Sequence, residues 1–204
     1  MRLLNEKTKS AILEAGKKEF LEYGFEKASL RRIAAIAQVT TGAIYTYFPD
    51  KGALFEALVR EPAEELKGHF LKATKTMDET LSEDISSWRK WLDVDPRSLV
   101  DFLYQHFEAF HLLCCKASGT SYEGYMNGLA EMETAATTHL IKHLQQSKVL
   151  KRELEEELIH IITSTYYAGI FEPIAHEMPK EKALQYVEVL GEFYTAGWQK
   201  ILGF

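Results

Sequence analysis

Two short apolar stripes, separated by a brief turn, constrain the fold of this 204-residue chain more than any other feature. In the first stripe, Leu30, Ile33, Ala34 and Ala37 recur at intervals of three and four residues. This spacing predicts a helix with one buried face, and Ser29 before it is a favourable N-cap residue. Gln38 and Val39 then make the turn to a neighbouring helix.

The second stripe predicts that neighbour. Thr40 can cap a helix by accepting a hydrogen bond from backbone N–H groups. Ile44 and Phe48 lie four residues apart, so we expect both side chains to face back onto Ile33 and Ile36. A proline directly after Phe48 forbids continuation of the helix. The two stripes together predict a helix-turn-helix pair over about residues 29–48.

The opposite face of the second helix is small and rich in hydroxyl groups, with Thr41, Gly42, Tyr45 and Thr46 on it and Tyr47 toward one edge. Gly42 has no side chain to hold the backbone away from a phosphate. A helix of this kind fits the major groove of DNA, where the second helix of such a pair contacts base edges. We therefore expect double-stranded DNA as a partner.

Motifs around the pair point to a family. Gly24-Phe25 precedes the pair, the run Tyr45-Thr46-Tyr47-Phe48 closes it, and Lys51-Gly52-Ala53-Leu54 follows. With Gly42, these motifs resemble those of the TetR family of bacterial transcriptional repressors, over about residues 5–60. The resemblance implies an N-terminal three-helix domain and a larger helical domain that binds a ligand and forms a homodimer. It also implies a repressor that a small-molecule effector releases from a palindromic operator with two half-sites.

Ten residues are candidates for DNA contact. Arg31 is the best candidate for a bidentate guanine contact, because the second helix of the pair contains no Arg or Lys. Arg32 could reach a phosphate. The remaining candidates fall into two groups: Thr41, Gly42, Tyr45 and Thr46 are expected at base edges and the adjoining backbone, and Ser29, Thr40, Tyr47 and Lys51 at phosphates.

The charge of the chain agrees with this placement once it is divided by position. The whole chain has a net charge of −6. Residues 1–60 hold ten Lys/Arg against seven Asp/Glu, a net charge of +3, and the remainder holds 14 against 23, a net charge of −9. Basic charge is therefore concentrated near the predicted DNA-contacting helices, as phosphate contact requires.

The rest of the chain also reads as helices, so we predict an all-α fold. Pro62 is expected to kink or split the helix that begins near Lys51. We divide the chain into a DNA-binding domain at 1–50 and a regulatory domain at 51–204, with ligand sensing at about 77–147 and dimerisation at about 152–202. The predicted helices lie at about 5–24, 29–48, 51 into the seventies, 82–92, 96–116, 120–147, 152–176 and 180–202.

The middle of the chain is rich in aromatic and thioether side chains, which line ligand cavities but equally build ordinary cores. Core packing is the commoner role for any one of them. The candidate ligand contacts are Trp88, Trp91, Phe102, His106, Phe107, Phe110, His111, Tyr122, Tyr125 and Met126.

The last two predicted helices are apolar on several faces, which indicates partners on more than one side. The TetR resemblance implies that they form the dimer interface, and packing within one chain is the alternative. A dimer would also place two DNA-contacting helices about 34–36 Å apart, one turn of DNA. The candidate interface residues are Ile162, Tyr166, Gly169, Ile170, Leu190, Phe193, Tyr194, Gly197 and Trp198.

Other chemistry finds little support. Cys114 and Cys115 are adjacent and unsuited to bridge each other, which fits a reducing cytoplasm. Two Glu-x-x-His spacings and the pair His139 and His143 could serve a metal, but chance and a polar helix face explain them. No catalytic residue set is visible, and no apolar stretch is long enough to span a membrane. We thus expect neither an enzyme nor a metal or cofactor; the alternatives are a helical small-molecule-binding protein without an operator and, third, a metal-dependent helical enzyme.

Overall fold

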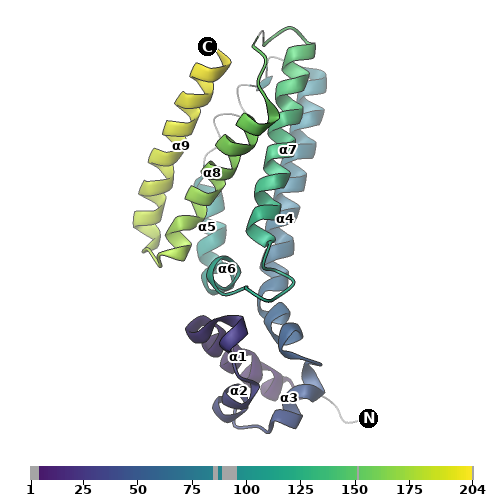
Figure 1. Cartoon of the computed structure of the whole chain (residues 1–204), viewed down its shortest axis with the longest axis vertical. Coiled ribbons are helices and arrows are strands. Elements are labelled where there is room, and N and C mark those ends of the chain that lie inside the picture. Colours follow the sequence, from purple (N-terminus) through teal and green to yellow (C-terminus); the bar gives the residue numbers. More distant parts are fainter. Residues whose placement is uncertain (1–4, 85–86, 89–95, 151, 204) are drawn as a thin grey trace. The chain divides into compact units, whose positions relative to one another are not determined.

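The computed structural model describes residues 5–84, 87–88, 96–150 and 152–203. Its regular elements are α-helices, with short turns and one 3₁₀ turn between them, and the described residues contain no strand (Figure 1). The predicted all-α class is confirmed. The helices are α1 (Glu6–Lys27), α2 (Leu30–Ile36), α3 (Thr41–Tyr47), α4 (Lys51–Glu83), α5 (Arg97–Gln105), α6 (Phe107–Cys115), α7 (Tyr125–Gln146), α8 (Glu156–Ala175) and α9 (Lys180–Leu202).

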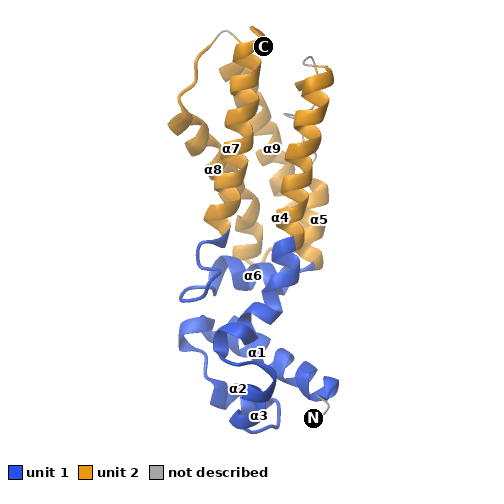
Figure 2. Ribbon diagram, turned by 90° about the vertical axis from the view of Figure 1, so that its right-hand side faces the viewer, with its two compact units in different colours: residues 1–64, 106–125 blue, residues 65–105, 126–204 orange. Residues whose placement is uncertain are grey.

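The chain folds into two compact units (Figure 2). The N-terminal unit holds residues 1–64 and 106–125, and the C-terminal unit holds residues 65–105 and 126–204. α6 joins the N-terminal unit because it packs on α1: Glu108 forms an ion pair with Lys17 at 2.7 Å, and the N–H of Phe25 donates to the carbonyl of Lys116 at 3.0 Å. The functional division at residue 50 stays a prediction, since packing groups the chain differently.

The core of the N-terminal unit joins α1, α2, α3 and the start of α4. Its fully buried side chains include Ile12, Phe20, Ile33, Ile44, Leu54 and Phe55. Phe20 and Phe55 meet edge to face, with ring centroids 5.3 Å apart. The stripes predicted for α2 and α3 therefore supply core residues, as their spacing indicated.

Ile36 departs from that expectation, because its side chain is 50% exposed. At 3.6 residues per turn, Ile36 lies roughly 110° around α2 from the middle of the buried stripe. Ile44 and Phe48 thus pack against a surface that Ile33 shares but Ile36 does not.

Several predicted boundaries move. Gly24 adopts φ 72° and ψ 165° and interrupts α1, which resumes for one further turn to Lys27. α4 continues through Pro62, so the predicted split does not occur. The single helix predicted at 96–116 is two helices, because His106 leaves the helical conformation with φ −115° and ψ 34°. α7 begins at Tyr125, later than expected.

The C-terminal unit is a helical bundle whose core lies between α4, α7, α8 and α9. Tyr104 at the end of α5 donates to the carbonyl of Met178 at 2.7 Å, just before α9. Arg97 in α5 forms an ion pair with Glu188 in α9. One buried cluster contains Met77, Leu81, Trp88, Leu140, Ile141, Leu144, Leu150, Ile159 and Leu202. No helix in the described part of the chain is long and apolar enough to cross a membrane.

Candidate nucleic-acid interface

α3 presents one apolar and one hydroxyl-bearing face. Ile44 and Phe48 are buried, whereas Tyr45 is 54% exposed and Gly42 and Thr46 are also exposed. The predicted orientation of α3 is confirmed. Two apolar anchors hold the helix against the domain, and its polar side is left available to a partner.

The turn before α3 fixes where the helix begins. Gln38 adopts a left-handed conformation with φ 55°, which reverses the chain after α2. The Oγ1 atom of Thr40 accepts a hydrogen bond from the N–H of Ala43 at 3.1 Å, so the predicted N-cap is confirmed. A Cβ atom added to Gly42 would meet nothing closer than Thr40 Oγ1, at 3.8 Å. Nothing within the chain therefore requires glycine at this exposed position.

Tyr47 holds the end of α3 to the beginning of α1. Its hydroxyl accepts from the N–H of Asn5 at 3.0 Å and lies 3.3 Å from the carbonyl oxygen of Asn5, to which it can donate. The ring was predicted to approach a phosphate. The structure shows instead an intramolecular contact across 42 residues, and the phosphate contact stays a prediction.

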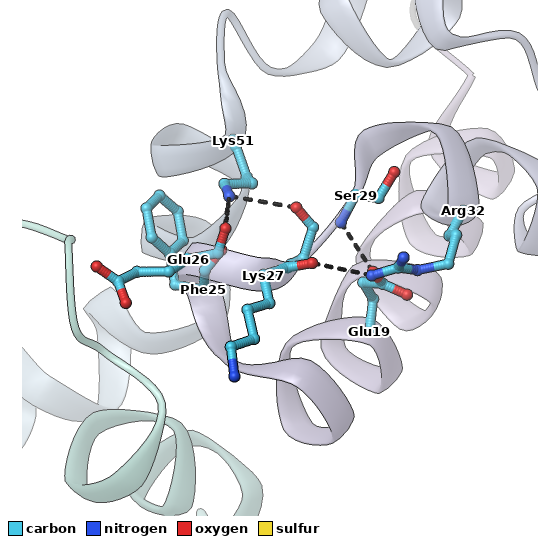
Figure 3. Close-up of polar contacts among 8 residues, drawn as sticks. Glu19, Phe25, Glu26, Lys27, Ser29, Arg32 and Lys51 are labelled. Atoms are coloured by element: carbon cyan, nitrogen blue, oxygen red, sulfur yellow. Dashed lines mark hydrogen bonds and ion pairs between the residues drawn. The ribbon is translucent and has the colours of Figure 1, made fainter.

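The side chain of Lys51 binds carbonyl groups at the C-terminal end of α1 (Figure 3). Its Nζ atom donates to the carbonyl oxygens of Phe25 at 2.6 Å, Glu26 at 3.2 Å and Ala28 at 3.2 Å. Nζ also lies 4.4 Å from the centroid of the Phe25 ring. An ammonium group has three donors, and here all three have acceptors inside the domain. Lys51 thus joins the first residue of α4 to the end of α1.

Arg32 and Glu19 form a second internal clamp (Figure 3). Nε of Arg32 donates to Oε1 of Glu19 at 2.7 Å, and Nη2 donates to the carbonyl of Lys27 at 2.9 Å. The N–H of Ser29 donates to the same Glu19 oxygen at 2.8 Å. Glu19 raises the pKa of Arg32 through this hydrogen bond. The hydroxyl of Ser29 does not cap α2, although Ser29 stands at the N-cap position.

Arg31 differs from its neighbour. It is exposed and makes no hydrogen bond or ion pair with another residue that the structure describes. Its guanidinium is therefore available to an external acceptor, in contrast with that of Arg32. The contact with guanine stays a prediction, but the geometry distinguishes the two arginines in the sense that the sequence suggested.

The ten candidate ligand contacts are divided between the two units. Trp91 lies outside the described residues. Trp88 is buried in the core cluster of the C-terminal unit. Phe102 and Met126 lie in the same unit, outside that cluster. The N-terminal unit holds His106, Phe107, Phe110, His111, Tyr122 and Tyr125. Their ligand role stays a prediction.

Several of these residues have structural partners. Phe110 is fully buried and His111 is nearly so. Tyr122 packs on Phe55, and the hydroxyl of Tyr125 donates to the carbonyl of Ala63 at 2.8 Å. Burial raises the pKa of Tyr125. The dense aromatic composition of this stretch is thus used largely to hold the N-terminal unit together.

Two cavities in the C-terminal unit are large enough to consider, and none of the nine described candidates lines either one. A groove of about 840 Å³ lies between α7 and α8. A smaller cavity of about 310 Å³ lies between α4 and α7. The groove is lined by Glu131, Thr134, Ala135, Thr138, His139, Lys142, Glu156, Glu157, His160 and Ile161. The smaller cavity is lined by Phe70, Leu71, Thr74, Met132, Glu133, Ala135, Ala136 and His139.

The predicted dimer-interface residues lie on α8 and α9, which pack on each other. Part of the set is used within the chain: Ile170 is buried, Trp198 packs on the core cluster, and a Cβ atom at Gly169 would lie 2.7 Å from a methyl group of Leu190. The ring of Tyr166 packs on that of Tyr194, which donates to Thr165 at 3.0 Å. Ile162 and Gly197 lie on α8 and α9.

The outer face of these two helices carries exposed apolar side chains that the sequence prediction largely missed. Phe193 is 71% exposed and Val189 is 66% exposed, with Tyr186 also exposed on α9. Leu158 and Ile161 are exposed on α8. The intervals of three and four residues place each set on one side of its helix, which is a signal the sequence contains.

Metal chemistry finds no support in the described part of the chain, where no group of three or more His, Cys, Asp or Glu residues could hold a metal ion. His139 lies beside Asp78, with Nε2 3.4 Å from Oδ1, and His160 lies 3.4 Å from the hydroxyl of Thr134.

Comparison with known proteins now adds to this geometry. Residues 12–58, which contain α2, α3 and most of α1, match the family model of "Bacterial regulatory proteins, tetR family". The N-terminal domain of this chain is therefore similar to that of the TetR family. The repressor BepR of Brucella suis is 44% identical over 62 residues, which are 29% of this chain and 30% of BepR. The regulator TtgR of Pseudomonas putida is 35% identical over 74 residues, or 36% of this chain and 35% of TtgR. The matches thus span about a third of these relatives.

The fold of the whole chain resembles that of TetR-family structures. NalD of Pseudomonas aeruginosa superposes with a TM-score of 0.57 at 22% identity, over 91% of this chain and 94% of NalD. FadR of Bacillus subtilis, solved with stearoyl-CoA, superposes with a TM-score of 0.56 at 16% identity, over 93% of this chain and 98% of FadR. At these identities the likeness concerns the fold alone.

Proposed function

We propose that this protein is a homodimeric, ligand-responsive DNA-binding regulator that represses transcription from a palindromic operator. The exposed hydroxyl face of α3, held out by the buried Ile44 and Phe48, is the observation that carries the proposal. The similarity of residues 12–58 to the TetR family supports it, and BepR, which matches over this region, is named as a repressor. A protein that binds an operator acts in the cytoplasm, so we propose that location.

We sort the proposed DNA contacts into three groups. Arg31, Tyr45 and Thr46 are exposed and face outward, so we propose that they contact base edges, together with Thr41 and Gly42. Thr40 and Ser29 lie at the N-termini of α3 and α2, where backbone N–H groups and the helix dipole favour phosphate. We propose a positioning role for the third group, which is Arg32, Tyr47 and Lys51, because their polar atoms already have partners inside the domain.

For the dimer, we propose the exposed apolar face of α8 and α9. Val189 and Phe193 lie four residues apart on α9, and water solvates both poorly. Replacing Phe193 with Lys should convert the dimer into a monomer in sedimentation velocity. A matched replacement of Gln199, which is also exposed on α9, should leave the dimer intact. A dimer that survives Phe193→Lys together with Val189→Lys would assign the interface elsewhere.

The experiment that tests the function is a fluorescence anisotropy titration with the DNA upstream of the protein's own gene. We expect nanomolar binding that weakens with salt. Thr46→Ala should weaken it about tenfold, since a lost base contact costs about 1–3 kcal/mol. Thr80→Ala is the control: each threonine donates to the carbonyl four residues earlier, at 3.3 Å for the exposed Thr46 and 2.8 Å for the half-buried Thr80.

The result also separates the alternatives. If the wild-type protein binds neither this DNA nor any member of a random duplex library, the operator function is refuted. A helical small-molecule-binding protein is then the better interpretation. Equal effects of Thr46→Ala and Thr80→Ala would refute the assigned face of α3.

A further inference from the structure

The smaller cavity of the C-terminal unit combines apolar walls with one carboxylate. Its volume, about 310 Å³, is at the lower end of the range for ligand sites. Phe70, Leu71 and Met132 give it apolar walls, and Leu71 is 55% exposed to solvent at this surface. Glu133 is the one carboxylate among the described residues that line it. The cavity therefore suits a compact apolar molecule with one polar group.

Glu133 sits where its charge is poorly solvated. Burial raises the pKa of this carboxyl, and the hydroxyl of Tyr167 on α8 donates a hydrogen bond that partly offsets the effect. Among the described residues, no lysine or arginine lines the cavity. An anion in such a setting is stabilised by any cation that enters beside it, because the cation replaces the solvation that burial removed.

One aromatic ring lines the cavity with this carboxylate, and a second, from α8, donates a hydrogen bond to it. Phe70 on α4 lines the cavity and meets Tyr167 edge to face, with ring centroids 5.5 Å apart. Tyr166 meets Tyr167 in the same way, also at 5.5 Å. Aromatic faces attract cations, and quaternary ammonium groups in particular. The Phe70 ring at the cavity thus favours a positively charged ligand, as the carboxylate of Glu133 does.

The remaining charged groups at this place do not reverse that sign. His139 lines the cavity, and its Nε2 lies 3.4 Å from Oδ1 of Asp78 on α4. With the imidazole neutral, the two carboxylates Glu133 and Asp78 give a charge of −2; with it protonated, the sum is −1. Whether His139 is neutral or protonated, these described groups would together repel an anion.

The larger groove between α7 and α8 lacks this selectivity. Its Lys142 and Glu156 already form an ion pair, and Glu131 and Glu157 are exposed to water. Charges that water or a partner satisfies gain little from a ligand. The smaller cavity is therefore the better candidate for a ligand of defined charge.

We propose that the cavity between α4 and α7 binds a monovalent organic cation with a compact apolar body, with Glu133 opposite the charge and Phe70 against the apolar part. A quaternary ammonium with one aromatic ring has the required size and charge. The proposal rests on the proposed function only in regarding the occupant as an effector. Binding itself can be measured without DNA, so failure here and failure of operator binding are distinguishable.

Ligand-observed NMR titration of the full-length protein tests the inference with three probes of similar size. They are benzyltrimethylammonium, its uncharged carbon isostere neopentylbenzene, and the anion phenylacetate. We expect the ammonium to bind at least about tenfold more tightly than the isostere and phenylacetate to bind least. Glu133→Gln, which keeps an acceptor for Tyr167, should weaken the ammonium about tenfold and leave the isostere unchanged.

Two further variants make the test specific. Glu131→Gln removes the same charge from an exposed site two residues away on α7 and should leave all three affinities unchanged. Phe70→Leu, which keeps the wall apolar, should weaken the ammonium more than the isostere. The inference is overturned if the ammonium fails to bind, if the isostere or the anion binds as tightly, or if Glu133→Gln and Glu131→Gln have equal effects.

Discussion

Nε of Arg32 lies 2.7 Å from Oε1 of Glu19, and this single carboxylate oxygen also accepts the N–H of Ser29 at 2.8 Å. Glu19 is only 2% exposed, although it carries a charge. Its side chain reaches from α1 to the start of α2 and orients that helix before α3 begins. The placement of α3 thus depends on a residue more than twenty positions earlier.

Replacing Glu19 with Ala should lower the free energy of unfolding by about 1–3 kcal/mol, since the N–H of Ser29 and the guanidinium of Arg32 lose a shared acceptor. Urea denaturation followed by circular dichroism would measure the loss. Glu22→Ala, an exposed position on the same helix, is the control and should change stability little. Similar losses for the two variants would show that the clamp contributes nothing particular.

Replacing Lys51 with Met should cost about 2 kcal/mol of stability, because three carbonyl oxygens lose a charged donor. The slope of operator affinity against salt concentration should remain that of the wild type, as no phosphate contact is removed. Lys18→Met, at an exposed position of α1, should leave stability unchanged. A flatter salt slope for Lys51→Met would instead reveal a direct phosphate contact.

Arg31 and Arg32 should separate cleanly in function. Arg31→Ala should leave the melting temperature unchanged, cost about 1–3 kcal/mol of operator binding and relax sequence preference. Arg32→Ala should lower the melting temperature, because it breaks the contact with Glu19. Thermal melts paired with binding to a randomised operator library would measure both quantities. An Arg31→Ala protein with unaltered base preference would exclude the guanine contact.

Glu133 gives a pH dependence whose sign follows from its raised pKa. The folded protein holds this proton more tightly than the unfolded chain does. The stability that this carboxyl contributes is therefore greatest below its ordinary pKa of 4.5, and it is lost as pH rises through the folded pKa. The Glu133→Gln variant should lack this loss. Its melting temperature relative to wild type should therefore rise from pH 4 to pH 7, whereas that of Glu131→Gln should stay constant. Calorimetry at both pH values would show whether the difference exists.

Local patterns allowed much of the fold and the outline of the site to be predicted. The spacing of Ile33, Ala34, Ile44 and Phe48 fixed the helix pair, and Thr40 marked the start of α3, because burial periodicity and capping act over a few residues. These are short-range effects. They leave a trace in any sequence that uses them.

The internal clamps could not be predicted in this way. Lys51 and Tyr47 reach partners 26 and 42 residues away, and only the folded chain brings those atoms together. One signal was present but unused: Glu19 stands in the buried stripe of α1 with Ile12, Ala15 and Phe20. A carboxylate at an inward position requires a partner. From that requirement alone, a contact between Glu19 and Arg32 or another cation could have been predicted.

The tie between Tyr47 and Asn5 makes Asn5 a structural strut ahead of α1: its main-chain atoms contact the Tyr47 hydroxyl, and its side chain accepts the N–H of Lys7 to cap α1. Cleavage just after Asn5 would remove it without touching a single group on the outer face of α3. A proteolytic nick or a poorly chosen cloning boundary would therefore loosen the far end of that helix. Loss of operator affinity in such a preparation would say nothing about the residues that contact DNA.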